Sequence, residues 1–218
     1  MSDVISILKK VQAVLTDGHF VYTSGKHGSI YVNKDAVYPH TSEASKIGKL
    51  FAEKFKSKNI DVVAGPAVGG TILSQWTAYH LSKLQKKEVL SVYTEKDKGT
   101  TASASESEHI FRRGYDKLIK NKRVLIVEDL TTTGISVRKV VDAVKNVGGK
   151  VVGIGVMINR DPKNVTSKAV GGPFTALGIL KAEAFDEKKC PLCKKGIPIN
   201  TNVGHGRKYL EAKKAAKQ

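Results

Sequence analysis

V-L-I-V-E-D-L-T-T-T-G-I-S, which runs from Val124 to Ser136, predicts a buried strand, a turn and the first residues of a helix. The apolar residues 124–127 are typical of a strand with both faces covered. Valines then recur at positions 137, 140, 141 and 144, and spacings of three and four residues indicate a helix. Because unpaired backbone N–H groups gather where a helix begins, the turn predicts a binding site for an anion.

Two carboxylates, Glu128 and Asp129, follow directly after the predicted strand. They are unexpected beside a bare phosphate, because like charges repel each other. The ligand is therefore expected to carry a phosphate at one end, with hydroxyl groups or a metal ion next to it. A sugar phosphate has this arrangement: the turn 131–134 would hold its phosphate, and the two carboxylates would face its hydroxyls.

Strand and helix patterns alternate along most of the chain, which predicts an α/β fold with a parallel sheet and helices on both faces. The expected strands are 60–64, 89–93, 123–127, 151–158 and 174–180, and the expected helices are 41–55, 71–86 and 135–147. A further helix is expected from Asp3, with its apolar face extending as far as Leu15. Residues 18–40 are typical of short strands and turns, and the polar segment Glu95 to Glu108 is typical of a lid or loop.

A second turn, Gly65-Pro66-Ala67-Val68-Gly69-Gly70-Thr71, also joins a predicted strand to a helix. It nearly matches the nucleotide-binding P-loop, but it lacks the lysine of that motif, so a nucleoside triphosphatase is not expected. Its glycines would allow a pyrophosphate-sized anion to approach the backbone; the alternative is a tight turn with no ligand. Since ligands of open α/β sheets bind at the carboxyl ends of the strands, one ligand with phosphates at both ends would bridge the two turns.

The composition predicts a cytoplasmic protein with one substantial core, since 40% of the 218 residues are hydrophobic. No apolar run approaches the roughly 18 residues of a membrane span, and the N-terminus lacks the apolar block of a signal peptide. The formal net charge of +17 comes from dispersed lysines, and only 6% of the residues are aromatic. This pattern favours polyanionic small substrates over specific nucleic-acid binding.

The two cysteines form Cys190-Pro191-Leu192-Cys193, near the C-terminus. Two thiolates do not complete a tetrahedral zinc site, and no second C-x-x-C motif is present. His205 or a partner subunit would have to supply further ligands. A structural turn with reduced thiols is the simpler interpretation, and it is the one we expect.

Segments along the whole chain resemble a known enzyme family. Val124–Ser136 resembles the phosphoribosyl pyrophosphate (PRPP) signature of type I phosphoribosyltransferases. The segment Gly18 to Lys26 with Tyr31 resembles the N-terminal hood of orotate phosphoribosyltransferases, and Phe111–Tyr115 and Cys190–Pro198 resemble bacterial and archaeal forms of that enzyme. The resemblance implies a Rossmann-like type I phosphoribosyltransferase core, 41–182, with a hood, 1–40, and a C-terminal extension, 183–218.

The resemblance also implies roles for individual residues. The expected PRPP-binding residues are Ala67, Val68, Gly69, Gly70, Lys96, Glu128, Asp129, Leu130, Thr131, Thr132, Thr133, Gly134, Ile135 and Ser136. The expected orotate-binding residues are Lys26, Thr132 and Arg160, whose guanidinium would pair with the orotate carboxylate. Lys96 and Asp129 are the expected catalytic residues. Mg²⁺ is the expected cofactor, held mainly through PRPP, and no side chain is predicted to be a direct ligand of the metal.

The segment Tyr93-Thr94-Glu95-Lys96-Asp97-Lys98-Gly99 departs from the mobile loop that the family usually carries. Only Lys96 aligns well; Lys98 is a weaker candidate, and His109 lies too far along the chain to be the usual histidine. Arg112 and Arg113 are expected either to bind phosphate or to fix the end of this loop.

The expected reaction is transfer of phosphoribose from PRPP to orotate by a homodimer with shared active sites. Trp76 and Tyr79, on a predicted helix, are expected to pack in the core or at the dimer contact. Two alternatives remain open: a type I phosphoribosyltransferase acting on a purine base, and a non-catalytic PRPP sensor that binds nucleic acid.

Overall fold

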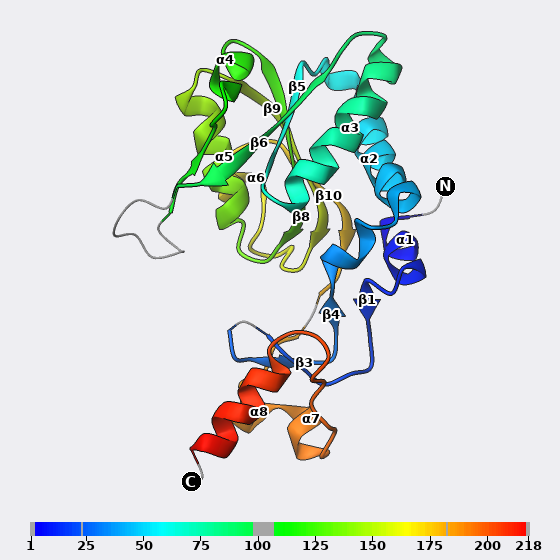
Figure 1. Cartoon of the computed structure of the whole chain (residues 1–218), viewed down its shortest axis with the longest axis vertical. Coiled ribbons are helices and arrows are strands. Elements are labelled where there is room, and N and C mark those ends of the chain that lie inside the picture. Colours follow the sequence, from blue (N-terminus) through cyan, green and yellow to red (C-terminus); the bar gives the residue numbers. More distant parts are fainter. Residues whose placement is uncertain (1–2, 23, 98–106, 182, 217–218) are drawn as a thin grey trace.

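The computed structural model describes residues 3–22, 24–97, 107–181 and 183–216 (Figure 1). Its main feature is a six-stranded sheet in the order β10-β9-β8-β5-β6-β7, parallel except for β7. The strands are β5 (Val62–Pro66), β6 (Leu90–Lys96), β7 (His109–Ile110), β8 (Arg123–Thr131), β9 (Lys150–Asn159) and β10 (Phe174–Ile179). The predicted α/β fold class is therefore confirmed, with a sheet that is mostly parallel.

Helices cover both faces of this sheet, as predicted. Helices α2 (Thr41–Phe55) and α3 (Gly69–Gln85) share one apolar core with alternate residues of β8, Leu125 and Val127. Helix α5 (Ile135–Asn146), with the short helices α4 (Tyr115–Ile119) and α6 (Ser167–Val170), packs on the intervening residues, Val124 and Ile126. Because successive side chains of a strand point to opposite faces, the run 124–127 supplies both cores.

The N-terminal helix is shorter than the sequence pattern predicts. Helix α1 spans Val4–Lys10, and the Asp3 side chain accepts a hydrogen bond from the Ser6 N–H, as the capping prediction requires. The chain then leaves the helix, because Gln12 adopts a positive φ of 54°. Strand β1 (Val14–Leu15) follows and pairs with β4 (Tyr31–Val32), so the expectation of a helix as far as Leu15 is wrong.

A small lobe lies beside the core and is built from two distant segments (Figure 1). Its first part is the hairpin of β2 (Phe20–Val21) and β3 (His27–Gly28); its second part contains the 3-10 helix η3 (Glu187–Lys189) and the helices α7 (Pro191–Lys194) and α8 (Gly206–Ala215). Backbone hydrogen bonds from Asn200 to His19 and from His205 to Val21 join them. The short 3-10 helices η1 (Lys34–Val37) and η2 (Lys56–Lys58) flank α2.

The segment between β6 and β7 is only partly described. Strand β6 extends to Lys96, so it includes Glu95 and Lys96, two residues that were expected in the polar loop. Strand β7 returns antiparallel to it, with Lys96 opposite His109. Within the described parts of the chain, no helix has the length and apolar character that crossing a membrane requires.

Candidate active site

Glu128 and Asp129 lie within β8, close to its carboxyl end, rather than beyond the strand as the sequence pattern predicted. Both are buried, with 6% and 4% of their surfaces exposed. The strand ends at Thr131, whose hydroxyl accepts a hydrogen bond of 3.0 Å from the Gly134 N–H. Gly134 has a φ of 77° and stands directly before the first residue of α5, so the turn 131–134 opens the helix as predicted.

Hydrogen bonds fix the orientation of both carboxylates. One Glu128 oxygen accepts the Asp129 backbone N–H at 2.8 Å, and the other lies 3.4 Å from the Ser136 hydroxyl. The Tyr38 hydroxyl donates to Asp129 Oδ2 at 2.9 Å, and Lys34 Nζ lies 3.1 Å from the same oxygen. Donors therefore surround the pair, and two of them, Tyr38 and Lys34, come from a segment far away in the sequence.

The charges of this group depend on one another. Burial and the neighbouring Asp129 carboxylate raise the pKa of Glu128 well above its usual range. Burial also raises the pKa of Tyr38, and the Asp129 carboxylate adds to that shift, so the phenol stays protonated and donates. Although partial burial opposes the charge of Lys34, the Asp129 and Asp35 carboxylates outweigh it and raise its pKa. A cationic or hydroxyl-bearing ligand here would relieve the crowding of negative charge.

The second predicted turn lies close to the acidic pair of β8. The peptide bond between Ala67 and Val68 is cis, and the Ala67 N–H donates to the Thr94 carbonyl at 2.9 Å. A Cβ atom on Gly69 would lie 1.8 Å from Asp129 Oδ2. Only a residue without a side chain therefore allows this close approach. As predicted, the two turns follow the carboxyl ends of strands in one parallel sheet, and those strands, β5 and β8, are neighbours.

A cavity of about 520 Å³ opens next to the turn 131–134. Its lining residues are Tyr22, Ser24, Leu130, Thr132, Arg160, Asp161 and Ala184. The Arg160 guanidinium lies 4.8 Å from the centre of the Tyr22 ring, and its Nε is buried without a hydrogen-bond partner among the described residues. A planar, anionic group is the natural partner for such a guanidinium.

An adjoining cavity of about 250 Å³ extends from this wall to Lys34, the lysine that pairs with Asp129. Arg160, Leu130 and Tyr22 line both cavities, and Lys34 and His205 line the second. The structure therefore places Thr132 and Arg160 at one pocket, next to the strand that carries Glu128 and Asp129.

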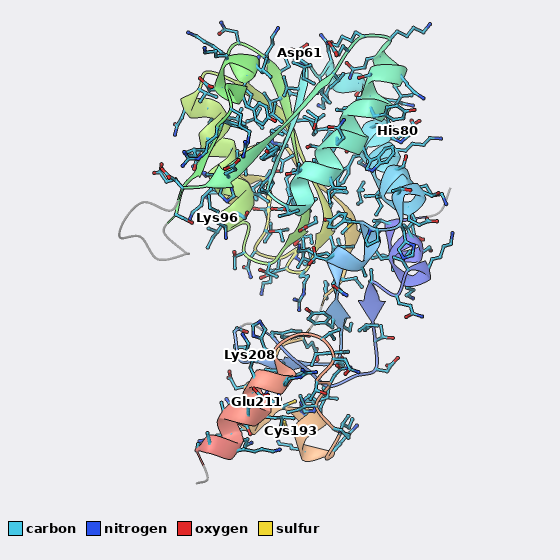
Figure 2. All side chains as sticks on the ribbon, in the orientation of Figure 1. Asp61, His80, Lys96, Cys193, Lys208 and Glu211 are labelled. Atoms are coloured by element: carbon cyan, nitrogen blue, oxygen red, sulfur yellow. The ribbon has the colours of Figure 1, made fainter. Side chains whose placement is uncertain are left out.

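The remaining predicted site residues lie farther from this centre. Lys26 is half exposed and lies 3.8 Å from Asp186 in the small lobe; it does not line either of these two cavities. Lys96 is exposed at the end of β6, on the core (Figure 2). Lys98 lies outside the described residues. The expected roles of Lys26 and Lys96 stay predictions.

Arg112 and Arg113, for which two roles were expected, both form ion pairs beside the loop. Arg112 and Arg113 form ion pairs with Asp97 and Glu95, which supports the interpretation that they fix the end of the loop. His109 is buried, and its Nδ1 lies 2.9 Å from the Thr94 hydroxyl.

Sequence reasoning missed Lys34, Tyr38 and Tyr22. All three come from the segment that was expected to form only strands and turns of the hood. A polar or aromatic residue there carries no local signal, because its contact with Asp129 or Arg160 exists only in the folded chain.

The two cysteines also have partners that the sequence did not predict. His19 and His27, from the hairpin of the small lobe, lie beside Cys190 and Cys193. His205 was the proposed source of a further ligand, but it lines the cavity around Lys34 and Arg160 instead.

Comparison with known proteins adds an independent finding. The family model described as "Phosphoribosyl transferase domain" matches residues 33–170. An orotate phosphoribosyltransferase of Caldanaerobacter subterraneus subsp. tengcongensis is 34% identical over 196 residues, which cover 90% of this chain and 93% of that one. One of Thermotoga maritima is 34% identical over 203 residues, 93% of this chain and 98% of the other.

Solved structures show the same fold. The crystal structure of orotate phosphoribosyltransferase from Aeropyrum pernix superposes with a TM-score of 0.62 at 24% identity, covering 82% of this chain and 94% of that chain. With the PRPP-type turn, the acidic pair and the extent of the match to the curated relatives, the conclusion is that this chain belongs to the orotate phosphoribosyltransferase family of type I phosphoribosyltransferases.

Proposed function

We propose that this protein transfers phosphoribose from PRPP to orotate, which yields orotidine 5′-monophosphate and pyrophosphate. The main support is Arg160, which lines the cavity beside Thr132 and whose buried Nε has no hydrogen-bond partner among the described residues. The orotate carboxylate would form an ion pair with that guanidinium, and the Tyr22 ring, which lies against the guanidinium, would keep it in place. A purine base offers no carboxylate for this contact.

PRPP would span the two turns. The backbone N–H groups and hydroxyls of residues 131–136 would bind its 5-phosphate at the start of α5, where the helix dipole favours an anion. Glu128 and Asp129 would accept hydrogen bonds from the ribose hydroxyls. The turn 67–70 would contact the pyrophosphate, and its backbone is already held against Asp129 by the glycine at position 69.

The chemistry requires positioning and charge more than a protein nucleophile. The bond between ribose C1 and the pyrophosphate oxygen breaks, the bond from C1 to a ring nitrogen of orotate forms, and the ring nitrogen loses its proton. Positive charge develops on the sugar, and the buried carboxylates of Glu128 and Asp129 would stabilise it. Lys96 would cover the departing pyrophosphate, and Arg160 would orient the acceptor nitrogen.

The residues around the acidic pair fit a magnesium ion that is held through the substrate. Mg²⁺ prefers oxygen ligands and often binds through one or two carboxylates plus substrate phosphates. Both Glu128 oxygens and Asp129 Oδ2 already have protein partners, which supports a magnesium ion held mainly through PRPP rather than by a cage of side chains. When bound with PRPP, Mg²⁺ would neutralise the pyrophosphate and polarise the sugar hydroxyls.

The proposal includes a homodimer and the division into hood 1–40, core 41–182 and extension 183–218. Tyr79 supports a contact along α3, because 46% of its surface is exposed and its ring meets Trp76 edge to face at 5.8 Å. Light scattering of the wild type and of Tyr79→Glu would test the dimer contact. The wild type is expected to be a dimer and the variant a monomer, and a monomeric wild type would contradict the proposed homodimer.

Arg160→Ala should lower kcat/KM for orotate by about a hundredfold or more, because a buried charge-assisted pair is worth roughly 3 kcal/mol. The KM for PRPP should change less than about threefold, since Arg160 faces the acceptor. The measurement is pyrophosphate release with PRPP, Mg²⁺ and a panel of orotate, hypoxanthine and adenine.

Arg138→Ala is the matched control, because Arg138 is exposed on α5 and pairs only within its helix, with Asp142, in the contacts described. It should keep wild-type kinetics. Turnover of hypoxanthine or adenine without turnover of orotate would contradict the proposed acceptor. Equal losses for orotate and PRPP in the Arg160 variant would contradict the carboxylate contact.

A further inference from the structure

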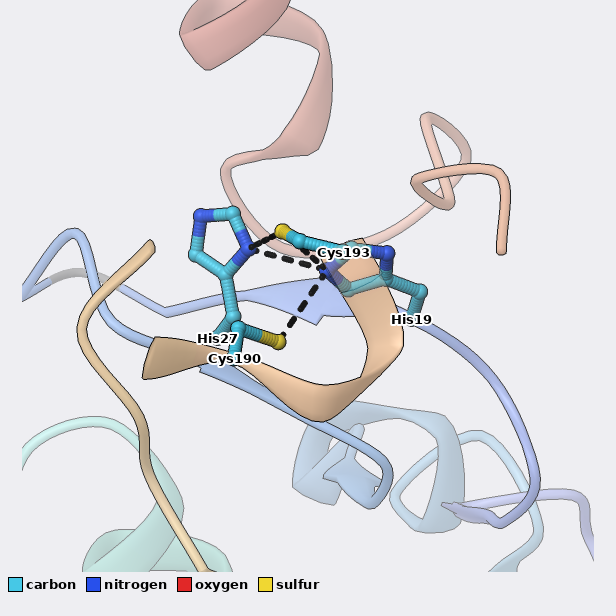
Figure 3. Close-up of side chains that lie close together, drawn as sticks. All are labelled: His19, His27, Cys190 and Cys193. Carbon is cyan, nitrogen blue, oxygen red and sulfur yellow. Dashed lines mark hydrogen bonds between the residues drawn. The ribbon is translucent and has the colours of Figure 1, made fainter. Parts of the chain in front are cut away.

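Four potential metal ligands meet inside the small lobe. Figure 3 shows the side chains of His19, His27, Cys190 and Cys193 pointing toward one another. The histidines belong to the hairpin around β2 and β3; Cys190 precedes α7, and Cys193 lies within it. His19, His27 and Cys190 are almost fully buried, with exposed fractions of 2%, 0% and 0%.

Three of the four distances given below match the spacing of ligand atoms around tetrahedral zinc, and the fourth, 2.9 Å, is shorter. His19 Nε2 lies 2.9 Å from His27 Nδ1, 3.6 Å from Cys193 Sγ and 3.8 Å from Cys190 Sγ. His27 Nδ1 lies 3.3 Å from Cys193 Sγ, and all four donor atoms lie within 4.8 Å of one another. Tetrahedral zinc, with bonds of about 2.0–2.3 Å, places its ligand atoms roughly 3.3–3.8 Å apart.

The tautomer of His19 suits a metal ligand. His19 Nδ1 lies 2.7 Å from the Ile197 carbonyl, which can only accept, so Nδ1 carries the proton and Nε2 presents its lone pair. His27 Nε2 is buried without a hydrogen-bond partner among the described residues. Among these residues, His27 Nε2 lacks a partner in either tautomer. His27 Nδ1 can donate a proton to the His19 Nε2 lone pair, or both atoms can offer their lone pairs to one cation between the rings.

The small lobe has few other sources of stability. Neither apolar core of the molecule contains a described residue from 16–35 or from 181–218. The strands β2 and β3 have two residues each, and α7 has four. Phe20 and Val21 are buried within the lobe, but outside both cores. Elements this short, without a larger core of their own, commonly depend on a metal or a disulfide. The two cysteines are free thiols in this structure.

We propose that His19, His27, Cys190 and Cys193 bind one zinc ion in a closed structural site. Two thiolates and two imidazoles suit zinc, whereas Mg²⁺ prefers oxygen. Four protein ligands leave no open position for a substrate, so the ion ties the C-terminal extension to the hood and takes no part in the reaction. Tyr22 and Ala184, which line the acceptor cavity, belong to the segments that the ion joins.

The first test is the metal content of the full-length protein, purified from cells supplied with zinc and measured by mass spectrometry. About one zinc per chain is expected, as a closed four-ligand site requires. Replacement by Co²⁺ should give the intense visible absorption of tetrahedral cobalt bound by thiolates. Less than a tenth of a zinc per chain, or a Cys190–Cys193 disulfide in the purified protein, would overturn the proposal.

Variants then assign the ligands. The double variant Cys190→Ser, Cys193→Ser should lose at least about nine-tenths of the zinc. His80→Asn is the control, because His80 lies on α3 far from the lobe, and it should retain the wild-type content (Figure 2). His205→Asn should also retain it. Wild-type zinc content in the double cysteine variant would overturn the assignment.

A chelator experiment on the wild type does not depend on how the variants fold. A zinc-selective chelator should lower the melting temperature, and added Zn²⁺ but not Mg²⁺ should restore it. An unchanged melting temperature after the metal has been removed would overturn the structural role. Because these readouts do not include turnover, they are independent of the proposed acceptor.

Discussion

Gly69 shows how one residue can fit a turn closely against the acidic pair of the neighbouring strand. Its missing side chain leaves room for Asp129 Oδ2 and for the Tyr38 hydroxyl, which would lie 1.8 and 2.4 Å from an added Cβ. Both of those atoms already bind each other. A methyl group at position 69 therefore has to displace the network that orients the carboxylate, rather than a flexible side chain.

Gly69→Ala should raise the KM for PRPP by about tenfold or more, because overpacking of this kind costs roughly 1–3 kcal/mol. The measurement is the initial rate against PRPP concentration at saturating orotate. Gly172→Ala is the control: its nearest neighbour is the end of the Ile154 side chain, at 3.1 Å, and it lines neither cavity around Arg160. An unchanged KM for PRPP in Gly69→Ala would contradict this role of the close fit at position 69.

Residues at the two turns could be predicted because their signals are local. A strand, a glycine-rich or hydroxyl-rich turn and a helix follow one another within a short run of sequence. The structure contains the same succession at both places. Lys34 and Tyr38 could not be predicted, since Tyr38 meets Asp129 across a sequence separation of 91 residues. His19 and His27 were missed for the same reason: their cysteine partners lie more than 160 residues away.

At the scale of elements, hydrophobic periodicity predicted the sheet and its main helices, with boundaries that differ by a few residues. Hydrophobic periodicity failed at residues 11–15, where the same apolar residues fit both a helix and a strand. The positive φ of Gln12 ends α1 and turns the next residues into β1. Such a backbone change is set by pairing with β4, which a local pattern does not contain.

His109, which is buried on β7, makes the free energy of unfolding depend on pH. Burial lowers the pKa of His109 to about 4, and the positive charges of Lys96 and Lys139 add to the shift. The folded state therefore favours the neutral imidazole, while the unfolded chain binds a proton near pH 6.5. The resulting stability is present above pH 6.5 and is lost as the pH falls toward 4.

His109→Gln should remove up to about 3 kcal/mol of the loss in unfolding free energy between pH 7 and pH 4. Urea unfolding at a series of pH values measures it. His40→Gln, which changes an exposed side chain, should keep the wild-type pH dependence. If His109→Gln and the wild type lose stability in parallel, the buried imidazole is not the group responsible.

At the scale of the whole molecule, the formal net charge of +17 acts over a longer range than any single contact. A positive field attracts the polyanion PRPP more strongly than orotate, which carries far less charge. Salt screens such a field, with a Debye length near 10 Å at about 0.1 M.

Raising the ionic strength from about 0.02 to about 0.5 M should therefore increase the KM for PRPP by roughly tenfold and the KM for orotate by less than about threefold. Steady-state kinetics at constant free Mg²⁺ would measure both, with two different monovalent salts as the control for specific ion effects. Equal increases for the two substrates would contradict a role for the overall charge.

The small lobe also has a consequence for how the protein is made. His19 and Cys190 are separated by 171 positions, so the hairpin leaves the ribosome long before its partners are synthesised. At about 5–20 residues per second, that interval is of the order of ten seconds or more. The core strands and helices can assemble during this time, whereas the lobe can close only late. We expect the acceptor side of the active site to mature after the PRPP side.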